Sequence, residues 1–92
     1  MSLQDQIHVL FNEITNNKNR VNSVLDDNVA KIKSLLQGKL NSTQMTIYLN
    51  WCNEICPEYR KEYMSSIGGV YVSHLFQNPI LDIVFDIENK ND

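Results

Sequence analysis

The chain has 92 residues, of which 42% are hydrophobic and 21% are charged, and its formal net charge is −3. This composition is typical of a globular domain and excludes a wholly disordered chain, while the length allows one hydrophobic core rather than two. We therefore expect residues 1–92 to form a single domain.

No export or membrane signal is recognisable in the sequence. The stretch Ile7 to Phe11 is much shorter than the hydrophobic region of a signal peptide, and no run approaches the roughly 18 apolar residues of a membrane span. Cys52 and Cys56, the two cysteines, give little support for a disulfide scaffold. We expect a cytoplasmic protein that does not bind membranes.

The charges are distributed unevenly along the chain. Residues 1–40 contain five Lys or Arg and four Asp or Glu, a net charge of +1, and the remainder contains three and seven, a net charge of −4. An acidic second half repels phosphate groups, and the dispersed cations of the first half form no basic stripe. The sequence therefore predicts no binding to nucleic acid.

Residues 2–37 are predicted to form an amphipathic helical segment with a coiled-coil-like pattern. Its apolar residues recur every three or four positions, and it ends where Gly38 can adopt the left-handed conformation that closes many helices. A heptad repeat read from Ile7 places two asparagines at core positions and must shift to reach Ile32. The residues assigned to this apolar seam are Leu3, Ile7, Leu10, Ile14, Asn17, Val21, Val24, Asn28 and Ile32.

Residues 16–19 decide whether this segment is one helix or two, because Asn16, Asn17 and Asn19 are poor helix formers. A continuous helix over residues 2–37 would be about 54 Å long, whereas a compact domain of this size has a radius of gyration of about 12 Å. Its seam would then need a second chain. A break would instead give a helical hairpin and a monomeric bundle. We favour the continuous helix.

Residues 41–87 are predicted to form a compact helical head. Asn41 and Gln44 have the spacing of a capping box, and helical spacing of apolar residues follows until Pro57, which closes that helix or opens the next. Helical spacing resumes from Tyr59 to Ile67, and Gly68-Gly69 interrupts it. Because nearly all aromatic residues lie in this half, we expect the core here.

The C-terminal part of the head permits two structures. Residues 70–76 and 80–87 could pair as a β-hairpin across residues 77–79. Alternatively, Asn78 could cap a helix that has Pro79 at its first position. We favour the helix, hence a mainly α fold, and we assign residues 88–92 to a polar tail.

No residue pattern indicates chemistry. Cys52 and Cys56 lie one helical turn apart and could bind zinc together with His8 and His74, but their place on an apolar face is more typical of small core residues. Neither histidine has a recognisable orienting partner for acid–base catalysis. We expect no catalytic, cofactor-binding or metal-binding residues, and therefore a protein that is not an enzyme.

The favoured function is protein–protein interaction, in which the N-terminal seam contacts an identical chain or a larger assembly. Trp51 lies at the edge of an apolar helix face, a position typical of a core-boundary residue, and an anchor in the interface is the alternative. A second hypothesis is a small monomeric helical bundle, a regulator or inhibitor, whose acidic second half binds a basic surface of its partner.

Overall fold

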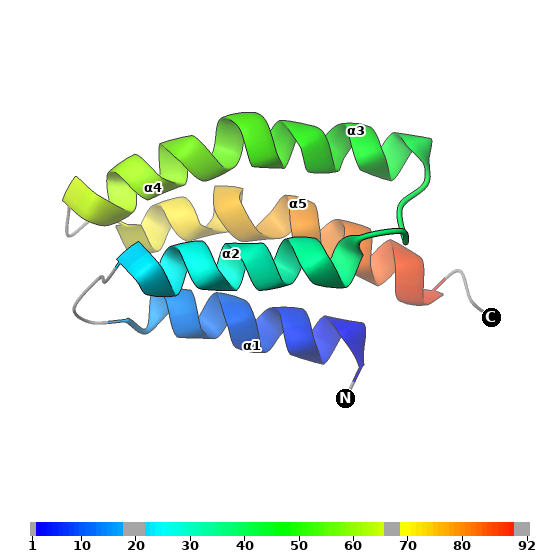
Figure 1. Cartoon of the computed structure of the whole chain (residues 1–92), viewed down its shortest axis with the longest axis horizontal. Helices are drawn as coiled ribbons and strands as arrows, with labels where there is room; N and C mark the ends of the chain where they lie inside the picture. The colour runs from blue at the N-terminus through cyan, green and yellow to red at the C-terminus, as the bar shows by residue number, and fades with distance from the viewer. Residues whose placement is uncertain (1, 18–21, 66–68, 90–92) are drawn as a thin grey trace.

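The computed structural model describes residues 2–17, 22–65 and 69–89, which form a bundle of four antiparallel helices (Figure 1). Its third helix is a continuous run of three parts, with a π-helical turn, η1, in the middle. The elements are α1 (Leu3–Thr15), α2 (Asn22–Leu36), α3 (Ser42–Asn50), η1 (Trp51–Ile55), α4 (Cys56–Ser65) and α5 (Gly69–Asn89). The mainly α prediction is confirmed, and no strand occurs in these described ranges.

The prediction of one continuous N-terminal helix is wrong. α1 ends at Thr15, where the backbone N–H of the capping residue Asn16 bonds to the Asn12 carbonyl at 2.9 Å, and α2 returns alongside α1 in the opposite direction (Figure 1). The hairpin alternative is therefore the right one, although Lys18 and Asn19 lie outside the described residues. The bundle is 41 Å long, shorter than the roughly 54 Å of an unbroken helix.

The C-terminal end of α2 and the N-terminal end of α3 lie where Gly38 and the Asn41–Gln44 pair predict them. Gly38 has a φ of 78°, a left-handed conformation that costs glycine little because it has no Cβ. Asn41 and Gln44 form a full capping box, in which the Gln44 N–H donates to Asn41 Oδ1 at 2.8 Å and the Asn41 N–H donates to Gln44 Oε1 at 3.0 Å. The connection between α2 and α3 is thereby fixed by residues close in sequence.

Pro57 neither closes nor opens a helix, contrary to expectation. The chain passes through it because the preceding π turn is wider than an α turn, with the Cys56 N–H bonded to the Trp51 carbonyl five residues back. In a regular α-helix the proline ring clashes with the carbonyl four residues earlier and supplies no N–H. A π turn placed immediately before the proline relieves this crowding.

α5 excludes the β-hairpin alternative and also corrects the predicted helix start. The helix begins at Gly69 rather than at Asn78, so Pro79 lies inside it, and it continues to Asn89. Glu88, which we assigned to a polar tail, is helical, and its Oε1 accepts a hydrogen bond from the Gln4 N–H of α1. Packing on four other elements, α1, α3, η1 and α4, offsets the cost of the internal proline.

The core draws on all four helices rather than on the second half alone. Phe76 of α5 lies at its centre, stacked on Tyr59 at a centroid distance of 4.0 Å and on Trp51 at 5.5 Å, with Phe11 of α1 edge-on at 5.4 Å. The buried apolar side chains are Ile7, Leu10, Phe11, Ile14, Leu25, Ile32, Leu36, Trp51, Tyr59, Tyr63, Phe76, Ile80, Ile83 and Val84. Each such side chain contributes roughly 1.5–3 kcal/mol on burial, so the N-terminal hairpin is an integral part of the fold.

Candidate interaction surfaces

Most of the residues predicted to contact a second chain are covered by this chain's own helices. Ile7, Leu10, Ile14, Asn28, Ile32 and Trp51 are buried, Leu3, Asn17 and Val24 are half-buried, and Val21 lies outside the described residues. The seam packs inside the bundle because α1 and α2 form a hairpin. In this fold, these buried residues are not part of the exposed surface.

Asn28 illustrates how the hairpin uses a polar residue at a core position. Its side chain is only 3% exposed, and its Nδ2 donates to the Leu10 carbonyl and to Glu13 Oε2, both at 3.0 Å. These bonds join α2 to α1. Asn28 thus fixes the pairing of two helices within one chain.

Trp51 lies in the core rather than at its boundary. It is fully buried, and its Nε1–H donates to the Phe76 carbonyl at 2.7 Å. That carbonyl lies three residues before Pro79 in α5. The indole therefore joins η1 to the turn of α5 that precedes Pro79.

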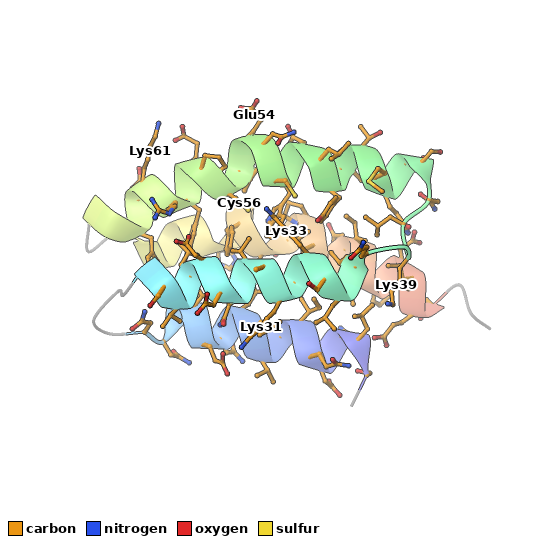
Figure 2. The ribbon with its side chains drawn as sticks, in the orientation of Figure 1. Lys31, Lys33, Lys39, Glu54, Cys56 and Lys61 are labelled. Carbon is orange, nitrogen blue, oxygen red and sulfur yellow. The ribbon has the colours of Figure 1, made fainter. Side chains whose placement is uncertain are left out.

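A cleft between α2 and the η1–α4 region, the α2/α4 cleft, contains the two cysteines and has a volume of about 340 Å³. Its lining residues are Leu25, Asp26, Val29, Ala30, Lys33, Cys52, Cys56, Pro57, Arg60 and Phe76. Figure 2 shows Lys33 extending from α2 toward the helix that carries Cys56. Arg60 Nε lies 3.1 Å from Asp26 Oδ1, so an ion pair spans the cleft.

The thiol of Cys56 is not poised for nucleophilic chemistry. Burial, and to a lesser extent the neighbouring Cys52, raises the pKa of Cys56 from its ordinary value of 9.0 to about 12. Burial likewise raises the pKa of the nearby Tyr48 to about 12, with a further contribution from its hydrogen bond to Cys52. Both groups are protonated at neutral pH, and a protonated thiol is a poor nucleophile.

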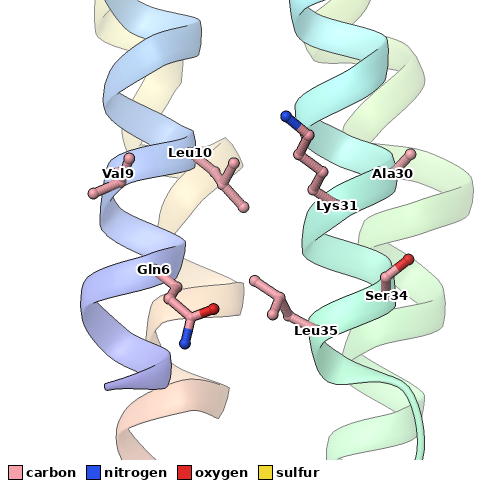
Figure 3. Close-up of a pocket in the computed structure, with 7 residues that line it drawn as sticks. All are labelled: Gln6, Val9, Leu10, Ala30, Lys31, Ser34 and Leu35. Carbon is pink, nitrogen blue, oxygen red and sulfur yellow. The ribbon is translucent and has the colours of Figure 1, made fainter. Parts of the chain in front are cut away.

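A second hollow, the α1/α2 groove, lies on the outer side of the hairpin and has a volume of about 560 Å³. In Figure 3, Leu10 and Leu35 extend toward each other from the facing helices, and Lys31 reaches into the gap between them. Val9 lines the same groove and is 43% exposed. Apart from Leu10, the residues predicted for the seam do not line this groove.

A third hollow, the α3/α5 groove, combines apolar and acidic side chains in a volume of about 480 Å³. Phe85 is 59% exposed and Ile47 is 42% exposed. Asp82 and Asp86 supply the charge, and Gln44 Nε2 donates to Asp86 Oδ2 at 2.6 Å. The full lining is Asn41, Thr43, Gln44, Ile47, Pro79, Asp82, Ile83, Phe85 and Asp86.

Sequence reasoning missed this groove, although one signal for it was present. Asp82 and Asp86 are four residues apart, and Phe85 lies on the same helix between them. That spacing places both carboxylates on one side of α5. The facing residue Ile47 comes from a helix more than thirty positions earlier, and its proximity depends on the tertiary fold.

No side-chain cluster typical of metal binding occurs in the described part of the chain, where no three His, Cys, Asp or Glu residues come together. His8 and His74 are exposed and do not complete a site with the cysteine pair. Among the described helices, none is long and apolar enough to cross a membrane. No protein-family model matches the chain, and neither does any curated protein or solved structure.

Proposed function

We propose that this protein is a non-enzymatic interaction module that binds a basic, partly apolar segment of a partner protein through the α3/α5 groove. One observation carries the proposal: exposed Ile47 and Phe85 lie beside Asp82 and Asp86, and no Lys or Arg is among the described residues that line the groove. The proposal develops the second hypothesis from the sequence, a monomeric regulator or inhibitor, and assigns its binding surface to the α3/α5 groove.

The exposed apolar side chains of the groove would provide binding energy when a partner covers them. Phe85 keeps more than half of its surface in water, and aromatic residues that become buried in the centre of an interface often dominate its binding energy. Ile47 faces the same groove from α3. Full burial of such a side chain contributes roughly 1.5–3 kcal/mol, and covering the exposed half of each contributes about half of that, roughly 1 kcal/mol.

The acidic part of the groove sets the kind of partner. Asp86 is held by Gln44, so its carboxylate is positioned before any partner arrives. Residues 41–92 carry a net charge of −4, which attracts a cationic segment and speeds its encounter with the groove. A Lys- or Arg-rich segment with apolar residues on one side matches both features.

A labelled amphipathic helical peptide, with leucines on one face and lysines on the other, tests the proposal by fluorescence anisotropy. The wild-type protein should bind it, and should bind a glutamate version of the same peptide at least about tenfold more weakly. Phe85→Ala should weaken binding of the lysine peptide, and the double variant Asp82→Asn, Asp86→Asn should weaken it and reduce its salt dependence.

Leu49→Ala is the matched control, because Leu49 is 48% exposed on α3 but does not line the groove. It should bind the lysine peptide as the wild type does. Equal affinity for the lysine and glutamate peptides, or undiminished binding by both groove variants, would overturn the proposal.

A second candidate function is self-association through the α1/α2 groove, which keeps the predicted role of the N-terminal segment on a different surface. Exposed Val9 and the apolar lining of this groove favour it. Sedimentation over a concentration series should show dimers that Val9→Asp dissociates and that His8→Asp, an exposed neighbour outside the groove, leaves intact. A wild-type monomer at all concentrations would exclude this candidate.

A further inference from the structure

We propose that the α2/α4 cleft binds a small apolar carboxylate, with its hydrocarbon part between α2 and η1–α4 and its carboxylate on Lys33. This site is separate from the α3/α5 groove. The proposal rests on the volume of the cleft, on its lining residues and on the position of one cation, Lys33.

The cleft exists because α2 packs mainly against α1 and leaves a gap on its other side. The floor of this gap is formed by Phe76 and Leu25, which are 0% and 2% exposed. Val29 and the two cysteines form half-buried walls. Its volume of about 340 Å³ is near the lower end of ligand pockets, which measure about 300–1,000 Å³, so a short-chain amphiphile fits better than a large cofactor.

Lys33 gives the cleft its preference for an anion. Lys33 lines the cleft together with Cys56, and its side chain extends from α2 toward the helix that carries that cysteine (Figure 2). Of the other charged groups that face the cleft, Asp26 and Arg60 pair with each other at 3.1 Å. Within the described residues, Lys33 has no carboxylate partner of its own.

A ligand carboxylate would supply that partner at the edge of a region of low polarity, where a charge-assisted hydrogen bond is stronger than in water. The hydrocarbon part would cover Val29 and the two cysteines, of which Cys56 stays protonated at neutral pH. An apolar amine would instead bring its ammonium group against Lys33 and be repelled. The charge of Lys33 and the volume of the cleft therefore both favour a small apolar carboxylate.

Isothermal titration calorimetry with octanoate tests this site, with octylamine as the charge-reversed probe. Wild-type protein should bind octanoate, and Lys33→Gln should bind it at least about tenfold more weakly. Lys31→Gln is the matched control: it removes the same charge two residues away, but Lys31 lines the α1/α2 groove instead. It should bind octanoate like the wild type, and octylamine should bind the wild type more weakly than octanoate.

A second measurement locates the ligand. In a Cys52→Ser variant, octanoate should slow the reaction of Cys56 with iodoacetamide in proportion to site occupancy, because Cys56 lines the cleft. Lack of octanoate binding by the wild type, equal losses in Lys33→Gln and Lys31→Gln, or unchanged thiol reactivity at saturation would each overturn the proposal. None of these outcomes bears on peptide binding at the α3/α5 groove.

Discussion

The Asn28→Asp substitution tests whether the N-terminal hairpin is joined by a buried amide. It keeps the shape of the side chain but replaces its donating NH₂ group with a carboxylate oxygen. That oxygen would face the Leu10 carbonyl and the Glu13 carboxylate, both of which accept hydrogen bonds from Asn28 at 3.0 Å. Two hydrogen bonds are lost, and a charge is buried against two acceptors.

A net hydrogen bond contributes about 1 kcal/mol, and a buried charged group without a partner costs more, so we expect a loss of about 2–4 kcal/mol in the free energy of unfolding at neutral pH. This is a large share of the roughly 5–14 kcal/mol expected for a chain of this length. Burial and the nearby acceptors should raise the pKa of the introduced carboxyl above its unfolded value of about 3.9.

The sign of the pH dependence follows from that shift. The folded variant binds its proton at a higher pH than the unfolded variant, so its stability deficit should shrink as the pH falls from about 7 toward 4. Urea denaturation of variant and wild type at both pH values measures this difference. Asn12→Asp, an exposed site on α1, should show little deficit at either pH. A variant as stable as the wild type at neutral pH, or a deficit independent of pH, would refute the reasoning.

Three further predictions concern stability. Trp51→Phe should lower the free energy of unfolding by about 1–2 kcal/mol, because the 2.7 Å hydrogen bond to the Phe76 carbonyl is lost while most of the aromatic ring remains. Urea denaturation followed by circular dichroism measures this loss, and an unchanged midpoint would contradict the prediction. Asn41→Ala should cost about 1 kcal/mol by removing the capping box of α3, with Ser42→Ala as the neighbouring control; equal effects of the two would count against the cap. Burial raises the pKa of Cys56 from 9.0 to about 12, so above pH 9.0 the thiol ionises more readily in the unfolded chain than in the folded one. The contribution of this thiol to the free energy of unfolding should therefore be fully present below pH 9.0 and be lost as the pH rises toward 12. Cys56→Ala should flatten that decline in thermal unfolding, and parallel profiles for variant and wild type would show that the thiol is not responsible.

The helical class of the fold could be read from the sequence because helix formation depends on residues three and four positions apart. The capping box of Asn41 and Gln44 and the left-handed Gly38 are formed by neighbours in the chain, and both occur where the sequence indicates them. Ile80, Ile83 and Val84 likewise recur with helical spacing, and they are buried on one side of α5.

The candidate site was predictable only in its charge. The acidic second half pointed to a basic partner, but the α3/α5 groove joins Ile47 to Phe85, and no local pattern shows that these residues share a surface. The burial of the predicted interface residues inside the chain's own bundle was missed for the same reason. A heptad-like pattern in Ile7, Ile14 and Ile32 specifies that these faces must be buried, and it does not specify which helix covers them.

By itself, the sequence determined where helical periodicity runs, how α2 and α3 are closed and capped, and that the second half is acidic, because these properties depend on neighbouring residues or on composition. The tertiary structure alone decided that the first segment folds back on itself and that α5 continues through Pro79. It also decided that Trp51 donates to the Phe76 carbonyl in the core. Each of these outcomes depends on contacts between distant residues, whose packing outweighs local preferences.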